Sequence, residues 1–508
     1  MEQNNYITAK EYSGISILLG ILSAAFLYYF STSTSPIIPN FYSDDSAVFQ
    51  VVGKAWANGK LPYVDVFDHK GPFIFMIEAI GYKFEIGKAG LLFGQWIFCL
   101  VDFIFIYKIG RLFMSKKWSL IHTVLSYVVF AISIQCGNLT EEYSLPFIII
   151  PLFLVIKYFI TIEEREHEHP FSYALYYGVA FAVLFMMRAT SAISICCIVL
   201  VVLIDLLIQK KWICIAKNMF GFIGGVIIAT LPFAIYFGIK GAMYDMVFGT
   251  IIYNLMYTSD SVFEIYSASM FAFVSDVLLL LAGIVHVLLK GKKDILGIFA
   301  IVLSFLTGAM MFTMNGYIHY FMILMPYYMV GVCLTVNIKE YIAKSTRNKI
   351  LYIMLCGCIS VQLLVGGFRT LRQPHYNDIN IRYSKQYQTM CNQFSGIIPD
   401  SEKDSVLAFG KNSLSAFYLG ADILPCFKYC FSQDWQARSS EKMTEEIYRF
   451  FDEKPAKWLV VNAEFDSEEI IMDYIPEFRD IIQEKYEIVS TCKVETNYEC
   501  YHLCKLRQ

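Results

Sequence analysis

The sequence predicts an all-α polytopic membrane protein with a small C-terminal α/β domain. Of its 508 residues, 56% are hydrophobic and only 17% are charged, whereas a soluble chain carries about 25% charged residues. The mean hydropathy is +0.50, and long apolar runs recur between residues 14 and 366 before the composition becomes polar. A net charge of −3 argues against a nucleic acid partner, because phosphate binding requires a basic surface.

Apolar runs that are long enough to cross a bilayer define the first part of the chain. A membrane-spanning helix requires roughly 20 apolar residues, and by this criterion we expect about 11 spans. The two runs that flank Arg188 alternatively form one interrupted element. The predicted spans are Gly14–Ser31, Gly90–Ile109, Leu120–Ile134, Tyr143–Thr161, Tyr173–Arg188, Ser191–Ile208, Met219–Gly238, Met270–Leu289, Ile295–Met314, Ile318–Val336 and Ile350–Gly366.

The charges between these runs predict the orientation. Lys and Arg gather in alternate loops, for example around Lys116, Lys210 and Lys290, and such loops are cytoplasmic by the positive-inside rule. We therefore expect a multi-pass protein of the cell membrane with a cytoplasmic N-terminus. An odd number of spans then places the tail outside.

The chain is therefore predicted to contain two domains. Residues 1–368 form the transmembrane domain, with residues 32–89 as its first extracytoplasmic loop, and residues 369–508 form a soluble extracytoplasmic domain. Strand-like and helix-like segments alternate in the tail, which is typical of an α/β fold. These segments are Val406–Phe409, Glu441–Asp452, Trp458–Val461, Glu468–Lys485, Tyr486–Val489 and Tyr501–Leu506.

The first outside loop contains the most informative polar residues. Asp44 and Asp45 follow the first span, and Asp68-His69-Lys70-Gly71-Pro72 precedes the next long apolar run. The polar residues alternate with apolar ones, as in short amphipathic helices that lie at the membrane interface. Lys70 would lie at the depth of a lipid phosphate. The alternative is that these acids are solvated loop residues.

Three further segments place polar groups at the ends of spans. Arg188 ends an apolar run, where it would either bind phosphate or extend to the interface. Glu141 and Glu142 start a span, where helix capping is the alternative to a functional role. His319 and Tyr320 occupy a third outside turn, where interface anchoring alone would explain Tyr320.

Several chemistries lack their sequence motifs. We find no phosphate-binding Gly-rich loop followed by Lys-Ser or Lys-Thr, no HExxH and no GxSxG. Nothing in the sequence therefore points to an ATP-driven pump, a zinc protease or a serine hydrolase.

The arrangement resembles the GT-C superfamily of integral membrane glycosyltransferases. The resemblance is strongest to the branch of dolichyl-phosphate-mannose protein mannosyltransferases and lipid A aminoarabinose transferases. In that family an Asp-Glu pair precedes an aromatic residue in the first outside loop, and a Lys-Pro-Pro or His-Pro-Pro segment ends the loop. Here Asp45-Ser-Ala-Val-Phe49 resembles the first element, or Asp44 and Asp45 are the acidic pair. Asp68-His-Lys-Gly-Pro72 resembles the second element, with Gly71 in place of one Pro.

The resemblance implies a membrane glycosyltransferase of a bacterial subgroup. Such an enzyme moves a sugar from a polyprenyl-phosphate donor to a lipid, glycan or protein acceptor of the cell envelope, with inversion at the anomeric carbon. Asp45, or Asp44 in the other alignment, would be the general base, which contributes about 10²–10⁴-fold. Lys70 and Arg188 would hold the phosphate. The remaining substrate-binding candidates are Asp68, His69, Glu141, Glu142, His319 and Tyr320.

The resemblance assigns no certain cofactor. Some relatives use a divalent metal, for which Asp45, Asp68 and His69 would be the ligands here.

Two other functions compete with the glycosyltransferase. A flippase or transporter of lipid-linked sugars would favour repeated halves with broken helices at matching positions, and we see neither in the sequence. A non-catalytic assembly protein would leave the acidic motif without a role.

Overall fold

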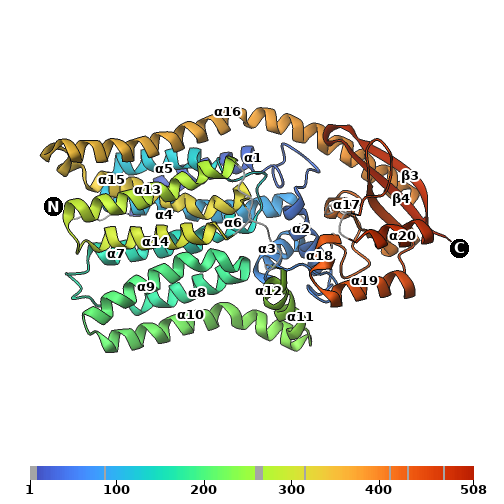
Figure 1. The fold of residues 1–508 in the computed structure, drawn as a ribbon, viewed down its shortest axis with the longest axis horizontal. Helices are drawn as coiled ribbons and strands as arrows, with labels where there is room; N and C mark the ends of the chain where they lie inside the picture. Colours follow the sequence, from blue (N-terminus) through green and yellow to red (C-terminus); the bar gives the residue numbers. More distant parts are fainter. Residues whose placement is uncertain are drawn as a thin grey trace.

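One long helix joins the two parts of the molecule. The computed structural model describes residues 9–84, 87–257, 267–313, 316–410, 414–431, 434–472 and 475–507. Helix α16 (Thr346–Ile397) runs for 52 residues along the helical bundle and continues into a C-terminal α/β domain (Figure 1). The predicted domain boundary at residue 369 falls inside this helix and not in a linker. The two chain termini lie at opposite ends of the molecule (Figure 1).

Every predicted span overlaps a helix of the bundle. In the described part of the chain, eight helical stretches are long and apolar enough to cross a membrane. Three further bundle helices have only 15–17 residues, so the expected number of about 11 spans stays a prediction. The bundle helices are α1 (Ala9–Phe30), α4 (Lys88–Phe113), α5 (Lys116–Phe130), α7 (Pro146–Ile160), α8 (Phe171–Met187), α9 (Ile193–Ile208), α10 (Trp212–Ile239), α13 (Ser267–Lys290), α14 (Ile295–Met311), α15 (Met325–Asn337) and α16.

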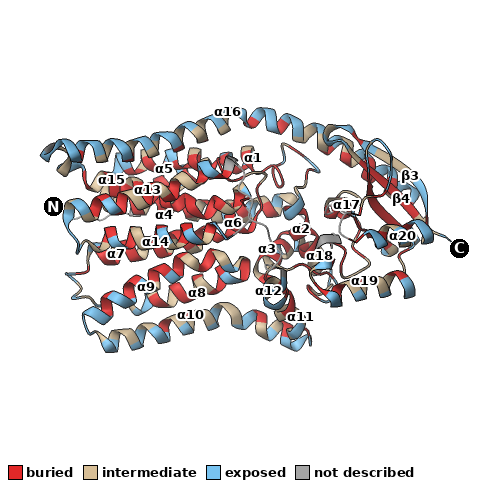
Figure 2. Cartoon of the chain, viewed as in Figure 1, coloured by how far each residue is buried: buried red, intermediate tan, exposed pale blue. Residues whose placement is uncertain are grey.

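The outer helices expose large apolar side chains. On α10, Ile213, Phe220 and Ile239 are 74%, 67% and 80% exposed, and much of α10 and of α16 is exposed, whereas the inner helices are buried (Figure 2). Soluble monomers rarely expose apolar surface over such an extent. This surface suits contact with lipid tails, and the protein is a polytopic membrane protein.

Small residues bring α8 and α10 into close contact. A β-carbon on Gly178 would lie 2.0 Å from the carbonyl oxygen of Phe222, and one on Gly225 would lie 2.0 Å from that of Leu175. Close backbone approach at small residues is a common way for membrane helices to associate.

The first loop contains two short helices, as predicted. Helix α2 (Asp44–Ala57) and helix α3 (Pro72–Lys83) lie between the bundle and the C-terminal domain (Figure 1). Pro72 occupies the first helical position of α3, where a missing N–H costs nothing. Gly53 of α2 packs directly on Glu78 of α3, since a β-carbon on Gly53 would lie 2.2 Å from the Glu78 β-carbon.

The C-terminal domain contains one four-stranded mixed sheet, in the order β1-β2-β4-β3. Strand β1 (Val406–Ala408) pairs parallel with β2 (Trp458–Ala463), and β4 (Glu499–Leu506) pairs antiparallel with β2 and β3 (Tyr486–Val494). The predicted strands and the α/β class are confirmed. The domain's helices are α17 (Ser415–Gly420), α18 (Asp434–Arg438), α19 (Glu441–Glu453) and α20 (Pro476–Lys485).

One predicted helix of this domain is too long. The helix expected at Glu468–Lys485 begins only at Pro476. Before it, Ile470 forms an isolated antiparallel bridge with Ala463 at the end of β2. The pairing with β2 keeps this segment extended, and Pro476 then starts the helix.

Replacing Gly225 by Ala is expected to separate α8 from α10, because the new methyl group meets backbone atoms that cannot move aside. We expect a loss of about 1–3 kcal/mol in the free energy of unfolding, measured by chemical unfolding in detergent. Gly224→Ala is the matched control, since its β-carbon would meet Leu175 at an ordinary 3.6 Å. Equal stability of the two variants would contradict this packing.

Candidate active site

Most of the predicted site residues converge at the end of the bundle that faces α2 and α3. Asp45 lies in the first turn of α2, and Glu141 lies in the first turn of the short helix α6 (Thr140–Ser144). Arg188 directly follows α8. His319 and Tyr320 lie in the 3-10 segment η4 (Ile318–Leu324) that leads into α15. Segments far apart in the sequence thus supply one cluster.

Arg188 holds three of these segments together. Its backbone is extended and ends α8, so the side chain leaves the helix end. Nη1 donates a hydrogen bond of 2.8 Å to Oε1 of Glu141, and the guanidinium stacks 3.3 Å from the ring centroid of Tyr320. The Glu141 side chain is only 3% exposed. A buried carboxylate of this kind requires its cation, so the pair fixes α6 against the end of α8.

Asp45 faces His319. Their closest atoms, Oδ2 of Asp45 and Nε2 of His319, are 3.5 Å apart, and the Asp45 side chain is 56% exposed whereas that of His319 is 9% exposed. On the other side of the ring, Nδ1 donates to Oε1 of Gln135 at 2.9 Å. Asp45 is therefore accessible to a substrate and lies beside the His319 ring.

Asp68, His69 and Lys70 form a tight turn beside this pair. The backbone N–H of Lys70 donates to Oδ1 of Asp68 at 2.9 Å, and Nζ of Lys70 lies 2.8 Å from Nε2 of His69. Burial lowers the pKa of His69 well below its usual value; Lys70 and Arg188 lower it further, and Asp45 opposes them. His69 is thus neutral near pH 7, and its Nε2 accepts from the Lys70 ammonium. A neutral partner leaves the charge of Lys70 available to an anion.

Gly71 allows this turn to approach the end of α8. A β-carbon on Gly71 would lie 1.9 Å from the carbonyl oxygen of Met186, which is two residues before Arg188. Proline carries a β-carbon and would meet the same oxygen. The substitution of Gly for one Pro of the family motif therefore has a steric reason in this chain.

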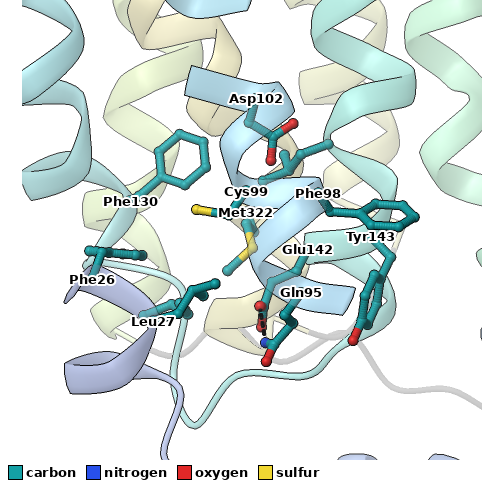
Figure 3. Close-up of a pocket in the computed structure, with 12 residues that line it drawn as sticks. Phe26, Leu27, Gln95, Phe98, Cys99, Asp102, Phe130, Glu142, Tyr143 and Met322 are labelled. Atoms are coloured by element: carbon teal, nitrogen blue, oxygen red, sulfur yellow. Dashed lines mark hydrogen bonds between the residues drawn. The ribbon is translucent and has the colours of Figure 1, made fainter. Parts of the chain in front are cut away.

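Glu142 turns away from the cluster. Nε2 of Gln95 donates to Oε2 of Glu142 at 2.6 Å, and Glu142 lines a small cavity of about 20 Å³ inside the bundle together with Asp102 and Cys99 (Figure 3). Neighbouring residues of a helix point in different directions, so only Glu141 reaches Arg188. The structure therefore brings Glu141 and not Glu142 to Arg188, and a substrate-binding role for Glu142 stays a prediction.

Asp44 also faces another direction. Although the residue keeps exposed surface, the protein packed around its carboxyl raises its pKa to about 6, and Asp45 and Glu499 add to the shift. Glu499 belongs to β4 of the C-terminal domain. Asp45 instead interacts electrostatically with His69. Of the two aspartates that the sequence left open, Asp45 is the one beside the cationic cluster.

The arrangement does not fit the suggested metal ligands. Within the described ranges, no three His, Cys, Asp or Glu side chains come together as a metal site requires. Asp68 is engaged with its own turn, and Asp45 is engaged with His319. We therefore assign no step to a metal.

Three supporting residues were missed by the sequence reasoning. Gln135 orients His319, Gln95 binds Glu142, and Nδ2 of Asn254 donates to the carbonyl of His69 at 2.7 Å. Asn254 belongs to α12 (Tyr253–Tyr257), which follows α11 (Met243–Val247) and the π-helical segment η2 (Phe248–Ile252). Polar side chains within apolar or aromatic segments were the signal that could have identified Gln95 and Asn254.

The N-terminal part of the chain matches the sequence model of a known protein family. The model of the family "Putative competence-induced protein Ccs4 N-terminal domain" matches residues 8–359. The chain belongs to this family. The match includes the bundle as far as the first part of α16, the first loop and every residue of the site cluster. No curated protein matches the sequence.

Solved structures show the fold of this Ccs4-family protein. ArnT from Cupriavidus metallidurans bound to undecaprenyl phosphate has a TM-score of 0.58 at 9% identity, over 98% of each chain. The apo state of the same protein has a TM-score of 0.55 at 9% identity, over 97% of this chain and 98% of that one. Archaeal oligosaccharyltransferase AglB from Archaeoglobus fulgidus, in complex with an inhibitory peptide and a dolichol-phosphate, has a TM-score of 0.50 at 11% identity. The alignment covers 91% of this chain and 70% of the AglB chain. The predicted GT-C-like fold is confirmed.

Truncating Glu141 is expected to leave Arg188 without its carboxylate. In a double-mutant cycle with Glu141→Ala and Arg188→Ala, we expect a favourable coupling of about 1–3 kcal/mol in the free energy of unfolding in detergent. The reason is that the single variant Glu141→Ala removes the carboxylate that a largely buried cation bonds. Strictly additive effects of the two substitutions would show that the pair does not stabilise the site.

Proposed function

We propose that this protein is a membrane glycosyltransferase that uses a polyprenyl-phosphate sugar and acts on a cell-envelope acceptor. One observation carries the proposal: an accessible carboxylate, Asp45, lies beside the cations Lys70 and Arg188 at one end of an apolar bundle. The GT-C-like fold supports it, because the similar structures include ArnT bound to undecaprenyl phosphate and AglB bound to a dolichol-phosphate.

Asp45 is the general base in this proposal. It takes the proton of the acceptor hydroxyl while the oxygen forms a bond to the anomeric carbon, which is a step worth about 10²–10⁴-fold in rate. The contact with His319 orients Asp45 before the acceptor arrives. Attack from the face opposite the phosphate inverts the anomeric carbon.

Lys70 and Arg188 bind the donor phosphate in this proposal. As the bond between the anomeric carbon and the phosphate oxygen breaks, negative charge grows on the departing polyprenyl phosphate, and two fixed cations stabilise that charge. The turn through Asp68 and His69 positions Lys70. Glu141, His319 and Tyr320 then lie toward the sugar and the acceptor.

The site end of the bundle faces outward in this proposal. The N-terminus lies at the opposite end of the bundle from α2, α3 and the C-terminal domain (Figure 1). The lysine-rich loops after α4, α9 and α13 lie at the N-terminal end as well, and the positive-inside rule makes that end cytoplasmic. A lipid-linked donor would then meet the site at the outer interface.

Asp45→Asn is expected to lower sugar transfer by about 10²–10⁴-fold, because an amide cannot accept the acceptor's proton. The measurement uses purified protein, a panel of labelled polyprenyl-phosphate sugars and a membrane extract as acceptor. Asp44→Asn is the matched control and should change transfer by less than about 10-fold, since Asp44 faces Glu499.

The possible results of this assay lead to different conclusions. Unchanged transfer by a folded Asp45→Asn variant would remove Asp45 as the base. If lipid-linked sugar binds to wild type but is never consumed, a flippase of such lipids becomes the better hypothesis.

Lys70→Met is expected to weaken binding of the donor by about 10–100-fold, the effect of losing one charge-assisted contact. The measurement is the equilibrium affinity of detergent-solubilised protein for a polyprenyl phosphate. Lys54→Met is the control, because Lys54 in the same loop pairs with the exposed Asp422. Equal affinities of the two variants would argue against phosphate binding at Lys70.

A further inference from the structure

A buried asparagine connects the segments that carry the site residues. Asn138 lies in the turn before α6, with a left-handed backbone (φ 62°) and a fully buried side chain. Its Nδ2 donates to Oγ of Ser46 at 2.9 Å and to Oε1 of Glu78 at 2.8 Å. Its Oδ1 accepts from the hydroxyl of Tyr143 at 2.7 Å. Three helices, α2, α3 and α6, therefore meet at this one side chain.

These bonds use most of the capacity of the amide, which offers two donors and two acceptor positions. The same hydrogen bonds give Asn138, the first residue of Asn138-Leu139-Thr140, a structural role. The triplet matches a glycosylation sequon, but its amide nitrogen is buried and engaged at both hydrogens.

The hydrogen-bonded partners are close in sequence to residues of the site. Ser46 directly follows Asp45, and Tyr143 lies two residues after Glu141. Glu78 is fixed by the contact of α3 with Gly53 of α2. A change in Glu78 or Asn138 would therefore be transmitted to the start of α2 and to α6 at the same time.

We propose that Glu78 and Asn138 are positioning residues that hold Asp45 and Glu141 in register for the transfer reaction. The role in transfer rests on the proposed function. The joint anchoring of α2 and α6 is independent of the proposed function. Neither residue reaches the site cluster through a bond of its own, so the effect passes through Ser46 and through the turn.

Glu78 acts in its neutral form. Burial raises the pKa of Glu78 to about 8, and the bond from Asn138 opposes the shift. Among the described residues, the titratable groups that interact with Glu78 are the phenols of Tyr82 and Tyr143, and neither supplies a positive charge. Ionisation above about pH 8 therefore places an unpaired charge in the buried contact.

The sign of the pH effect follows from this shift. Between the ordinary carboxyl pKa and about 8, the folded chain holds a proton at Glu78 that the unfolded chain has lost. Raising the pH through this range therefore weakens folding. Glutamine resembles the neutral acid in shape and can accept the same bond from Asn138, so Glu78→Gln should remove the pH dependence.

The test compares Glu78→Gln, Glu78→Ala and Asn138→Ala with wild type. The two alanine variants should lower kcat by about 10–100-fold with little change in KM for the donor, because the groups are displaced and not removed. Glu78→Gln should restore kcat to within about threefold and abolish the loss of activity above pH 8. Ile80→Ala is the matched control, since Ile80 lies two residues further along α3 and its side chain is 52% exposed.

A second readout does not depend on activity. Amide hydrogen exchange should rise in both α2 and α6 of Glu78→Ala and Asn138→Ala, and in neither helix of Ile80→Ala. Unchanged exchange in a folded alanine variant overturns the anchoring. Raised exchange with unchanged kcat in an active enzyme overturns the role in transfer. Wild type that transfers no sugar removes the proposed function, and the exchange result still decides the anchoring.

Discussion

The backbone of Gly71 lies so close to the carbonyl of Met186 that no β-carbon fits between them, and the site depends on this contact. It brings the turn that carries His69 and Lys70 to the end of α8, where Arg188 begins. Without this contact, Lys70 and Arg188 would not be brought together at one site. The contact connects a loop to a membrane helix through backbone atoms, which cannot rotate away as side chains can. A fixed pair of cations stabilises developing charge better than mobile ones.

The two cations of the cluster, Arg188 and Lys70, have different bonded partners. Glu141 binds Arg188 and neutralises it, and Asp45 lies 3.5 Å from His319. Lys70 instead bonds a histidine that burial keeps neutral. An incoming phosphate would find one cation without a bonded carboxylate and a second one, Arg188, already oriented by its partner. This arrangement favours an anion over a neutral ligand, and it leaves Asp45 accessible for proton transfer.

Much of the fold could be predicted because its cause is visible in composition. Each apolar run became a helix, and Arg188 was recognised because charge at the end of an apolar run is unusual. Directions could not be predicted: Glu141 and Glu142 are adjacent and equally acidic, yet only packing decides that one meets Arg188 and the other meets Gln95. The predicted boundary at residue 369 falls inside α16, because hydropathy falls where α16 leaves the bundle although the helix itself continues.

The first loop is held from both sides, which explains how it can carry a site. The bundle holds it at Gly71, and the C-terminal domain holds it through Phe67, whose N–H donates to the carbonyl of Lys428 at 2.8 Å. Lys60 adds a bond to the carbonyl of Pro425 at 2.5 Å. A loop fixed at only one side would lose part of its binding energy to ordering itself. The C-terminal domain therefore contributes to the site without supplying a residue to the cluster, and α16 sets its distance from the bundle as one continuous helix.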